Sequence, residues 1–171
     1  MRIAVLGHSQ ARYLHFDSYN IKVFYKSGAT FGSIRETTQF QSFLKYNPDL
    51  VFLLLGSNDI REQSTINSII SNYTELKEEI LGQIQVKEGI YLLDIERRTL
   101  SNKYIDKETF RKIRNSLIKN IKKIDKKYFL PYRPVSGLLE SDIGPDGTHV
   151  NSKGARKIAE TIEEKITEIL D

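Results

Sequence analysis

Asp49-Leu50-Val51-Phe52-Leu53-Leu54-Leu55 is the stretch of this sequence that decides the fold. After its first residue the stretch is apolar throughout, which is typical of a central parallel strand that is buried on both faces of a sheet. A strand of this kind needs helices packed against each side of the sheet. The stretch therefore favours an α/β architecture.

Shorter apolar runs and amphipathic patterns alternate around this stretch, which predicts strands and helices in turn. Strands are expected at 2–6, 21–25, 49–55 and 89–95, with a short fifth at 133–135. Helices are expected at 34–46, 66–80, 107–127 and 155–169. Ser64 or Thr65 is suited to cap the second helix, and Asn151 or Ser152 the last. This order favours a parallel sheet of about five strands with helices on both faces.

The length of 171 residues fits one domain spanning 1–171, because no linker, repeat or low-complexity segment interrupts it. The chain has no cysteine, and its three histidines show no HxH or HExxH spacing, so we expect neither a metal nor another cofactor. The apolar run near the N-terminus is too short for a signal peptide or a membrane span. We expect a cytoplasmic protein unless a leader has been removed.

The formal net charge is +4, and most of it lies in the predicted helix 107–127. Apolar residues recur there at helical spacing, which predicts an amphipathic helix with a basic outer face: Phe110, Ile113, Leu117, Ile121 and Ile124. The simpler interpretation is a solvated surface. The alternative is a non-catalytic domain that binds RNA or another anionic partner through this helix, although no RNA-binding motif accompanies it.

Polar loops follow the first three predicted strands, at the edge where parallel α/β sheets bind ligands. Ser9 lies in the first loop, Gly28 in the second and Asn58 in the third. The backbone N–H groups of Ser9 and Gly28 and the Asn58 amide could form an oxyanion hole with three donors.

The stretch Asp146-Gly147-Thr148-His149 places an acid three residues before a base, just ahead of the last predicted helix. With Ser9 as the third member, these residues have the chemistry of an activated hydroxyl nucleophile. His149 would take the proton from Ser9, and Asp146 would orient the imidazole ring and stabilise its charged form.

The four blocks, in this order, resemble the SGNH hydrolases, also called GDSL esterases and lipases. The matching positions are Ser9, Gly28, Asn58 and His149, and Asp146 matches the family's acid. The resemblance runs to about residue 165. It implies a flavodoxin-like three-layer α/β/α sandwich and hydrolysis of esters, thioesters or O-acetyl groups without a cofactor.

The chain departs from the family pattern beside the serine. His8 stands where the family usually has Asp, and Gln10 where it commonly has Leu. These neighbours support the loop and do no chemistry, so we expect such changes to be tolerated. His8 and His15 are interpreted as polar surface or loop-packing residues.

Each candidate residue also has a simpler interpretation. Ser9 and Asn58 could cap helices, and Gly28 and Asp146-Gly147 could be plain turns. Their joint presence favours catalysis. Asp59 is interpreted as a cap of the helix that follows, and so as a structural residue that braces its loop. Arg61 could anchor an acidic substrate group, although a solvated arginine is the simpler interpretation.

Two other enzyme-like folds fit less well. Only eight residues precede Ser9, whereas the nucleophile of an α/β-hydrolase follows several strands and an oxyanion loop. A flavodoxin-type nucleotide site would leave His149 unexplained, and the first loop holds one glycine rather than a glycine-rich run. We therefore expect a hydrolase for a small acylated substrate, with loops after Asp59 and at 97–103 shaping its pocket. The oligomeric state does not follow from the sequence.

Overall fold

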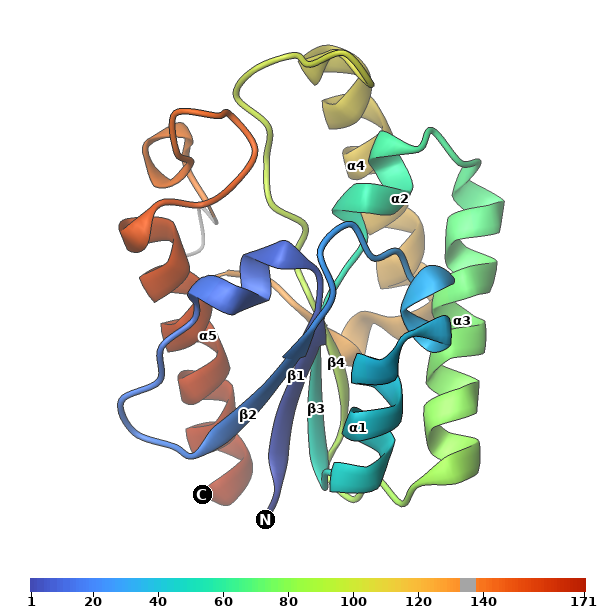
Figure 1. The fold of residues 1–171 in the computed structure, drawn as a ribbon, viewed down its shortest axis with the longest axis vertical. Coiled ribbons are helices and arrows are strands. Elements are labelled where there is room, and N and C mark those ends of the chain that lie inside the picture. Colours follow the sequence, from blue (N-terminus) through green and yellow to red (C-terminus); the bar gives the residue numbers. More distant parts are fainter. Residues whose placement is uncertain (133–137) are drawn as a thin grey trace.

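The computed structural model describes residues 1–132 and 138–171, which include a five-stranded, all-parallel sheet in the order β2-β1-β3-β4-β5 (Figure 1). The strands are β1 Ile3–Gly7, β2 Ile21–Tyr25, β3 Leu50–Leu54, β4 Gly89–Leu93 and β5 Phe129–Leu130. Four of them lie where they were predicted. The strand expected at 133–135 falls outside the described residues, and β5 precedes that position.

Side chains alternate across the sheet and fill a separate core on each face. Leu53 of β3 packs into one core, and Phe52 packs into the other. All five residues of β3 are buried, as the apolar run predicted. The strand at the centre of the sheet therefore stabilises both layers of helices.

The helices form the two outer layers of an α/β/α sandwich (Figure 1). One face carries α1 Thr38–Tyr46, α3 Ile66–Gln83 and α4 Lys107–Asp125; the other carries α5 Ser152–Leu170 and the short 3₁₀ helix η1 Ser9–Tyr13. The caps of α3 and α5 are Thr65 and Asn151, each from its predicted pair. Within residues 1–132 and 138–171, none of the helices is both long and apolar enough to cross a membrane.

The helix predicted at 34–46 is divided in two. Residues Ser33–Glu36 form the 3₁₀ helix η2, and α1 begins after Thr37. Thr37 has an extended backbone, and its hydroxyl oxygen accepts a hydrogen bond from the Phe40 N–H at 3.1 Å. This N-cap starts a new helix, so the continuous apolar pattern overestimated the length of a single one.

The basic helix α4 buries a narrower stripe than its sequence pattern suggested. Phe110, Leu117 and Ile121 are buried, but Ile124 is 59% exposed. Successive residues of an α-helix turn by about 100°, so Ile124 lies on the flank of the stripe rather than at its centre.

The pairing of β1 with β3 sets the position of the functional loops. Gly7 pairs with Leu54 at the carboxyl end of both strands, and the His8 N–H donates to the Leu54 carbonyl at 3.1 Å. A Cβ atom on Gly7 would lie 2.8 Å from that carbonyl oxygen, so the backbones approach too closely for a side chain. The loops after the two strands consequently leave the sheet side by side.

We expect Leu53→Ala to lower the free energy of unfolding by about 2–5 kcal/mol, because it opens a cavity in a fully buried strand. Leu81→Ala in α3 is the matched control, since Leu81 is 56% exposed; its effect should stay within about 0.5 kcal/mol. Denaturant unfolding of both variants measures the difference, and equal effects would contradict the central role of β3.

Candidate active site

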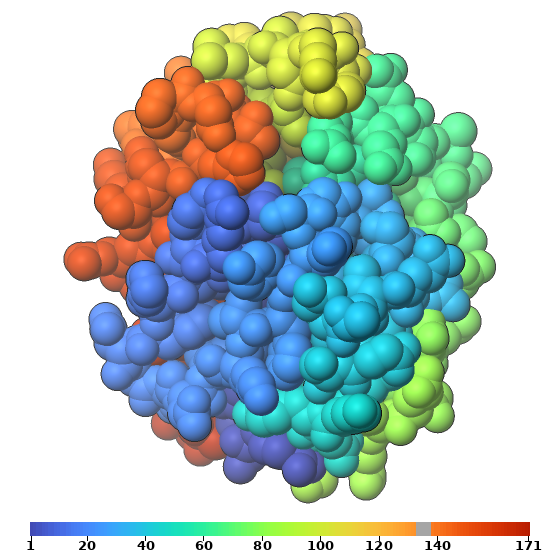
Figure 2. Space-filling view, viewed as in Figure 1, coloured from blue at the N-terminus to red at the C-terminus, as the bar shows by residue number. Residues whose placement is uncertain are grey.

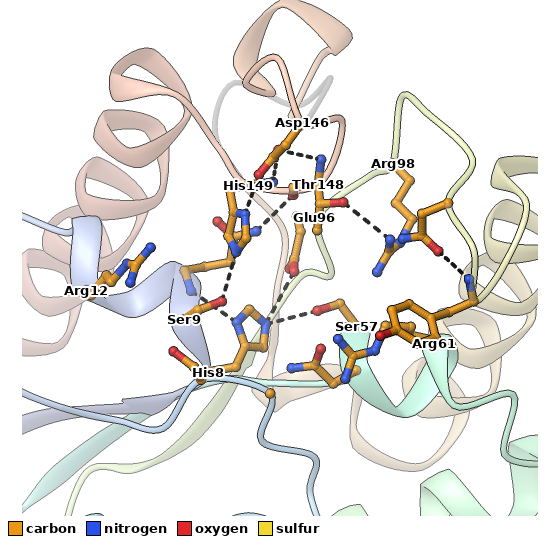
Figure 3. A pocket seen from close by; sticks show the side chains of 16 residues that line it. His8, Ser9, Arg12, Ser57, Arg61, Glu96, Arg98, Asp146, Thr148 and His149 are labelled. Carbon is orange, nitrogen blue, oxygen red and sulfur yellow. Dashed lines mark hydrogen bonds and ion pairs between the residues drawn. The ribbon is translucent and has the colours of Figure 1, made fainter.

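A cavity of about 380 Å³ lies at the carboxyl ends of the strands. Figure 2 shows the hollow where the N-terminal loops meet the segments near residues 60, 100 and 146. Sixteen of the described residues line it, and Figure 3 shows them from close by. The cavity includes every residue that the sequence analysis assigned to the triad and the oxyanion hole: Ser9, Gly28, Asn58, Asp146 and His149.

Ser9 is the first residue of η1, directly after β1. Its Oγ lies 3.1 Å from Nε2 of His149 (Figure 3). Its N–H lies in the first turn of the helix, where backbone donors have no partner within the helix. The helix cap is His8, so the interpretation of Ser9 as the cap was wrong.

His149 lies between Ser9 and Asp146. Its Nδ1 is 2.5 Å from Oδ2 of Asp146, which leaves Nε2 to accept a hydrogen bond from the Ser9 hydroxyl. Partial burial favours the neutral form of Asp146, but hydrogen bonds from the His149 ring and from the N–H groups of Thr148 and His149 outweigh it. They hold the pKa of Asp146 below its ordinary value.

The loop that carries Asp146 and His149 is closed at its base. Ile143 and Val150 form an antiparallel bridge, and the Gly144 N–H donates to the His149 carbonyl at 2.7 Å. Gly147 has a φ of +72°, and a Cβ atom on it would lie 2.6 Å from Leu100. Glycine therefore suits both this turn and the close packing of the loop.

Gly28 and Asn58 come from neighbouring loops. Gly28 has a φ of +78° and lines the cavity. Asn58 is in the short helix α2 Ser57–Arg61, and its Nδ2 donates to the Ala29 carbonyl at 3.0 Å. Because a side-chain amide has two N–H donors, this bond fixes the amide and leaves a second donor for a ligand.

Asp59 braces this loop, as predicted, but it lies within α2 and caps neither α2 nor the next helix, so its interpretation as a helix cap was wrong. Each of its carboxylate oxygens lies 3.3 Å from the Phe31 nitrogen, and the residue is buried. Burial raises the pKa of Asp59 to about 7, although the hydrogen bond from Phe31 acts in the opposite direction.

His8 is buried, so of its two interpretations the one as a loop-packing residue is confirmed and the one as a surface residue is wrong. Its Nδ1 accepts a hydrogen bond from the Gln10 N–H at 3.2 Å, which assigns the ring proton to Nε2. Nε2 lies 3.1 Å from the Ser57 Oγ and 3.3 Å from Oε1 of Glu96 (Figure 3). Burial opposes the ionised form of Glu96, but the adjacent His8 ring and the Ser57 hydroxyl hold the pKa of this carboxyl below its ordinary value.

Gln10 connects the serine loop to the histidine loop. Its Nε2 donates to the Thr148 carbonyl at 2.9 Å, and its Oε1 accepts from the Val150 N–H at 3.0 Å. The buried amide thus holds the backbone on both sides of His149. The leucine common at this position in SGNH hydrolases cannot make these two bonds.

The loops predicted to shape the pocket do line it. Arg61 follows Asp59 in α2, and Arg98, Asn102 and Tyr104 come from the segment after β4. Arg61 lies over the Tyr104 ring, with its Cζ 5.5 Å from the ring centroid, so it is not simply a solvated arginine.

The sequence analysis missed Glu96 and the bridging role of Gln10. Glu96 follows β4 at the carboxyl edge of the sheet, and that position was the available signal. Its partner His8 comes from the far side of β3, so no local pattern links the two. Among residues 1–132 and 138–171, no group of three or more His, Asp or Glu side chains is placed to hold a metal ion.

Residues 3–157 match the model of the GDSL-like Lipase/Acylhydrolase family. No curated protein matches the chain. Among solved structures, a GDSL-like lipase from Bacteroides thetaiotaomicron is similar, at 18% identity and a TM-score of 0.72 over 98% of this chain and 88% of that one. TesA is similar at 17% identity and a TM-score of 0.66, over 99% of both chains.

A catalytic mutant of an acetylxylan esterase from Geobacillus stearothermophilus is also similar, at 14% identity and a TM-score of 0.65. That match covers 96% of this chain and 93% of the esterase. At such identities these likenesses concern the fold, and they agree with the flavodoxin-like sandwich implied by the sequence.

We expect His8→Asp to destabilise the protein by about 3 kcal/mol, because it places a second carboxylate in the buried cluster that holds Glu96. His8→Asn is the matched control, since its oxygen can still cap the Gln10 N–H without adding charge; it should cost about 1 kcal/mol. Unfolding in denaturant at pH 7 gives both values.

Glu96→Gln on the His8→Asp background should restore part of the loss, since it removes the like charge. Equal stability of His8→Asp and His8→Asn would contradict the placement of the Glu96 carboxylate in a buried cluster beside residue 8.

Proposed function

We propose that Ser9 is the nucleophile of this chain, which belongs to the GDSL-like lipase/acylhydrolase family. Membership of this family makes the chain a hydrolase that acts on esters. The observation that carries this proposal is the continuous contact from Ser9 through His149 to Asp146, at 3.1 and 2.5 Å, on the wall of one cavity. In this arrangement Asp146 orients His149, and His149 is the general base.

The oxyanion hole of the proposed enzyme consists of the Ser9 N–H, the Gly28 N–H and the Asn58 amide. Three observations support it. The Ser9 N–H is in a first helical turn, the Gly28 backbone is open to the cavity, and the Asn58 amide is fixed by Ala29. Donors fixed before the reaction stabilise developing charge without reorganising.

The reaction then proceeds in two steps. In the first, Ser9 Oγ bonds to the ester carbonyl carbon as its proton passes to His149 Nε2, and the tetrahedral oxyanion collapses as the alcohol leaves with that proton. In the second, His149 takes a proton from water, the hydroxide adds to the acyl carbon, and the acid is released as Ser9 recovers its proton.

The lining of the cavity favours a small acyl group. None of the sixteen described residues that line it has an aliphatic hydrophobic side chain. A long acyl chain would find no aliphatic side chain to pack against there and would gain little from leaving water. An acetyl or similarly short group fits this surface, whether its bond is an ester, a thioester or a sugar O-acetyl.

We expect Ser9→Ala to abolish hydrolysis of 4-nitrophenyl acetate while leaving the unfolding midpoint nearly unchanged, since one partly exposed hydroxyl adds little stability. Ser27→Ala is the control, because Ser27 lines the same cavity outside the proposed triad. A fluorophosphonate probe followed by peptide mapping should label Ser9. Hydrolysis by Ser9→Ala at the wild-type rate would disprove the assignment.

Asn58→Ala should reduce kcat by about 100- to 1,000-fold, the usual loss for one oxyanion donor. KM should change much less, because this hydrogen bond forms mainly in the transition state. Steady-state kinetics on the same ester separate the two parameters. A change confined to KM would mean that Asn58 only binds substrate.

A further inference from the structure

Three arginines line the candidate active site, and two of them lie together on one side. Arg61 and Arg98 lie across the cavity from Ser9, whereas Arg12 lies beside the serine (Figure 3). Arg61 comes from α2 and Arg98 from the segment after β4. Two separate elements thus bring like charges to the same wall of the cavity.

Neither arginine of this pair has an acidic partner among residues 1–132 and 138–171. Arg61 lies over the Tyr104 ring, and Arg98 lies over the Phe110 ring at 4.8 Å. Arg98 also donates to the Thr148 hydroxyl at 3.3 Å, but its buried Nε has no hydrogen-bond partner. Aromatic rings orient the two guanidinium groups without neutralising them.

Some other arginines of the chain have acidic partners. Arg114 pairs with Asp94 at 3.0 Å, and Arg111 with Glu108 at 2.8 Å. Within the cavity, the carboxylates of Glu96 and Asp146 are engaged by His8 and His149. The positive charge of Arg61 and Arg98 is therefore not matched by a carboxylate in direct contact.

The electrostatics of Arg98 agree with this geometry. Burial lowers the pKa of Arg98, and the positive charge of Arg61 lowers it further, while Glu96 and Asp146 act in the opposite direction. A partly buried guanidinium beside a like charge is stabilised when an anion binds, and its planar set of donors matches a carboxylate or a phosphate.

We propose that Arg61 and Arg98 bind an anionic group of the substrate, so that the enzyme prefers short-chain esters that carry a carboxylate or a phosphate. The inference rests on the proposed function, because it assumes that the ester carbonyl is at Ser9. The polar and charged side chains that line the cavity suit such a substrate. Its anionic group would bind on the wall opposite the nucleophile.

Matched pairs of esters test this preference. The first pair is 4-acetoxybenzoate and its neutral methyl ester, with the charge on the alcohol part. The second is mono-4-nitrophenyl succinate and its neutral methyl ester, with the charge on the acyl part. We expect kcat/KM to be at least about 10-fold higher for the charged member of one pair, as one charge-assisted contact implies. The pair that shows the preference identifies which part carries the anion.

Arg61→Ala and Arg98→Ala should each bring that charged-to-neutral ratio down toward one, a loss of about 10-fold, because each removes charge-assisted hydrogen bonds to the anion. The ratio is the readout, since Arg98 contacts Thr148 and its loss can also slow the neutral ester. Arg98→Lys should retain part of the preference. Arg111→Ala is the control for lost charge, because Arg111 is on an exposed part of α4. Circular dichroism checks that each variant is folded.

The two proposals fail in different ways. Two results would overturn the anion site alone. The first is hydrolysis that depends on Ser9 but is equally fast for the charged and the neutral ester of both pairs. The second is a charged-to-neutral ratio that stays unchanged in Arg61→Ala and in Arg98→Ala. If no ester is hydrolysed, the proposed function fails. Calorimetric titration with inorganic phosphate then tests the anion site: binding that is lost in Arg61→Ala and Arg98→Ala supports it, and no binding overturns it.

Discussion

The close pairing of β1 with β3 is the constraint on which the rest of the site depends. Gly7 lies against the Leu54 carbonyl with no room for a side chain, and both strands end there. Because the strands are parallel, the loop with Ser9 and the loop with Asn58 leave the same edge of the sheet together. The apolar run of β3 holds this edge in place, since it is buried between both layers of helices.

A buried polar cluster lies next to the proposed nucleophile. His8 caps the first turn of η1 through Nδ1 and faces Ser57 and Glu96 through Nε2. One side chain therefore links the loops after β1, β3 and β4. Where the family usually has an aspartate, this chain has an imidazole ring whose Nε2 lies 3.3 Å from the Glu96 carboxylate. His8 thus contacts a residue far along the chain.

The histidine loop depends on contacts of the same kind. Asp146 orients His149 from within the loop, but Gln10 holds the backbone on both sides of the histidine from η1. The distance between Ser9 and His149 is consequently set by the residue next to the serine as well as by the triad. Arg61 and Arg98 lie opposite them, so the two sides of the cavity differ in proposed role.

Local patterns in the sequence determined the order of the first four strands and of the long helices, the burial of β3, the caps of α3 and α5, and the residues proposed for the triad and the oxyanion hole. They did so because periodicity, capping residues and turn residues act over a few positions. The break at Thr37 and the exposure of Ile124 were missed. An apolar pattern predicts which face of a helix is buried, but it does not predict where the helix begins or how wide the buried stripe is. Only the tertiary structure decided the burial of His8 against Glu96, the two bonds of Gln10, and the meeting of Arg61 with Arg98. Each of these joins segments far apart in the chain, and such contacts follow from strand order, register and loop paths rather than from neighbouring residues.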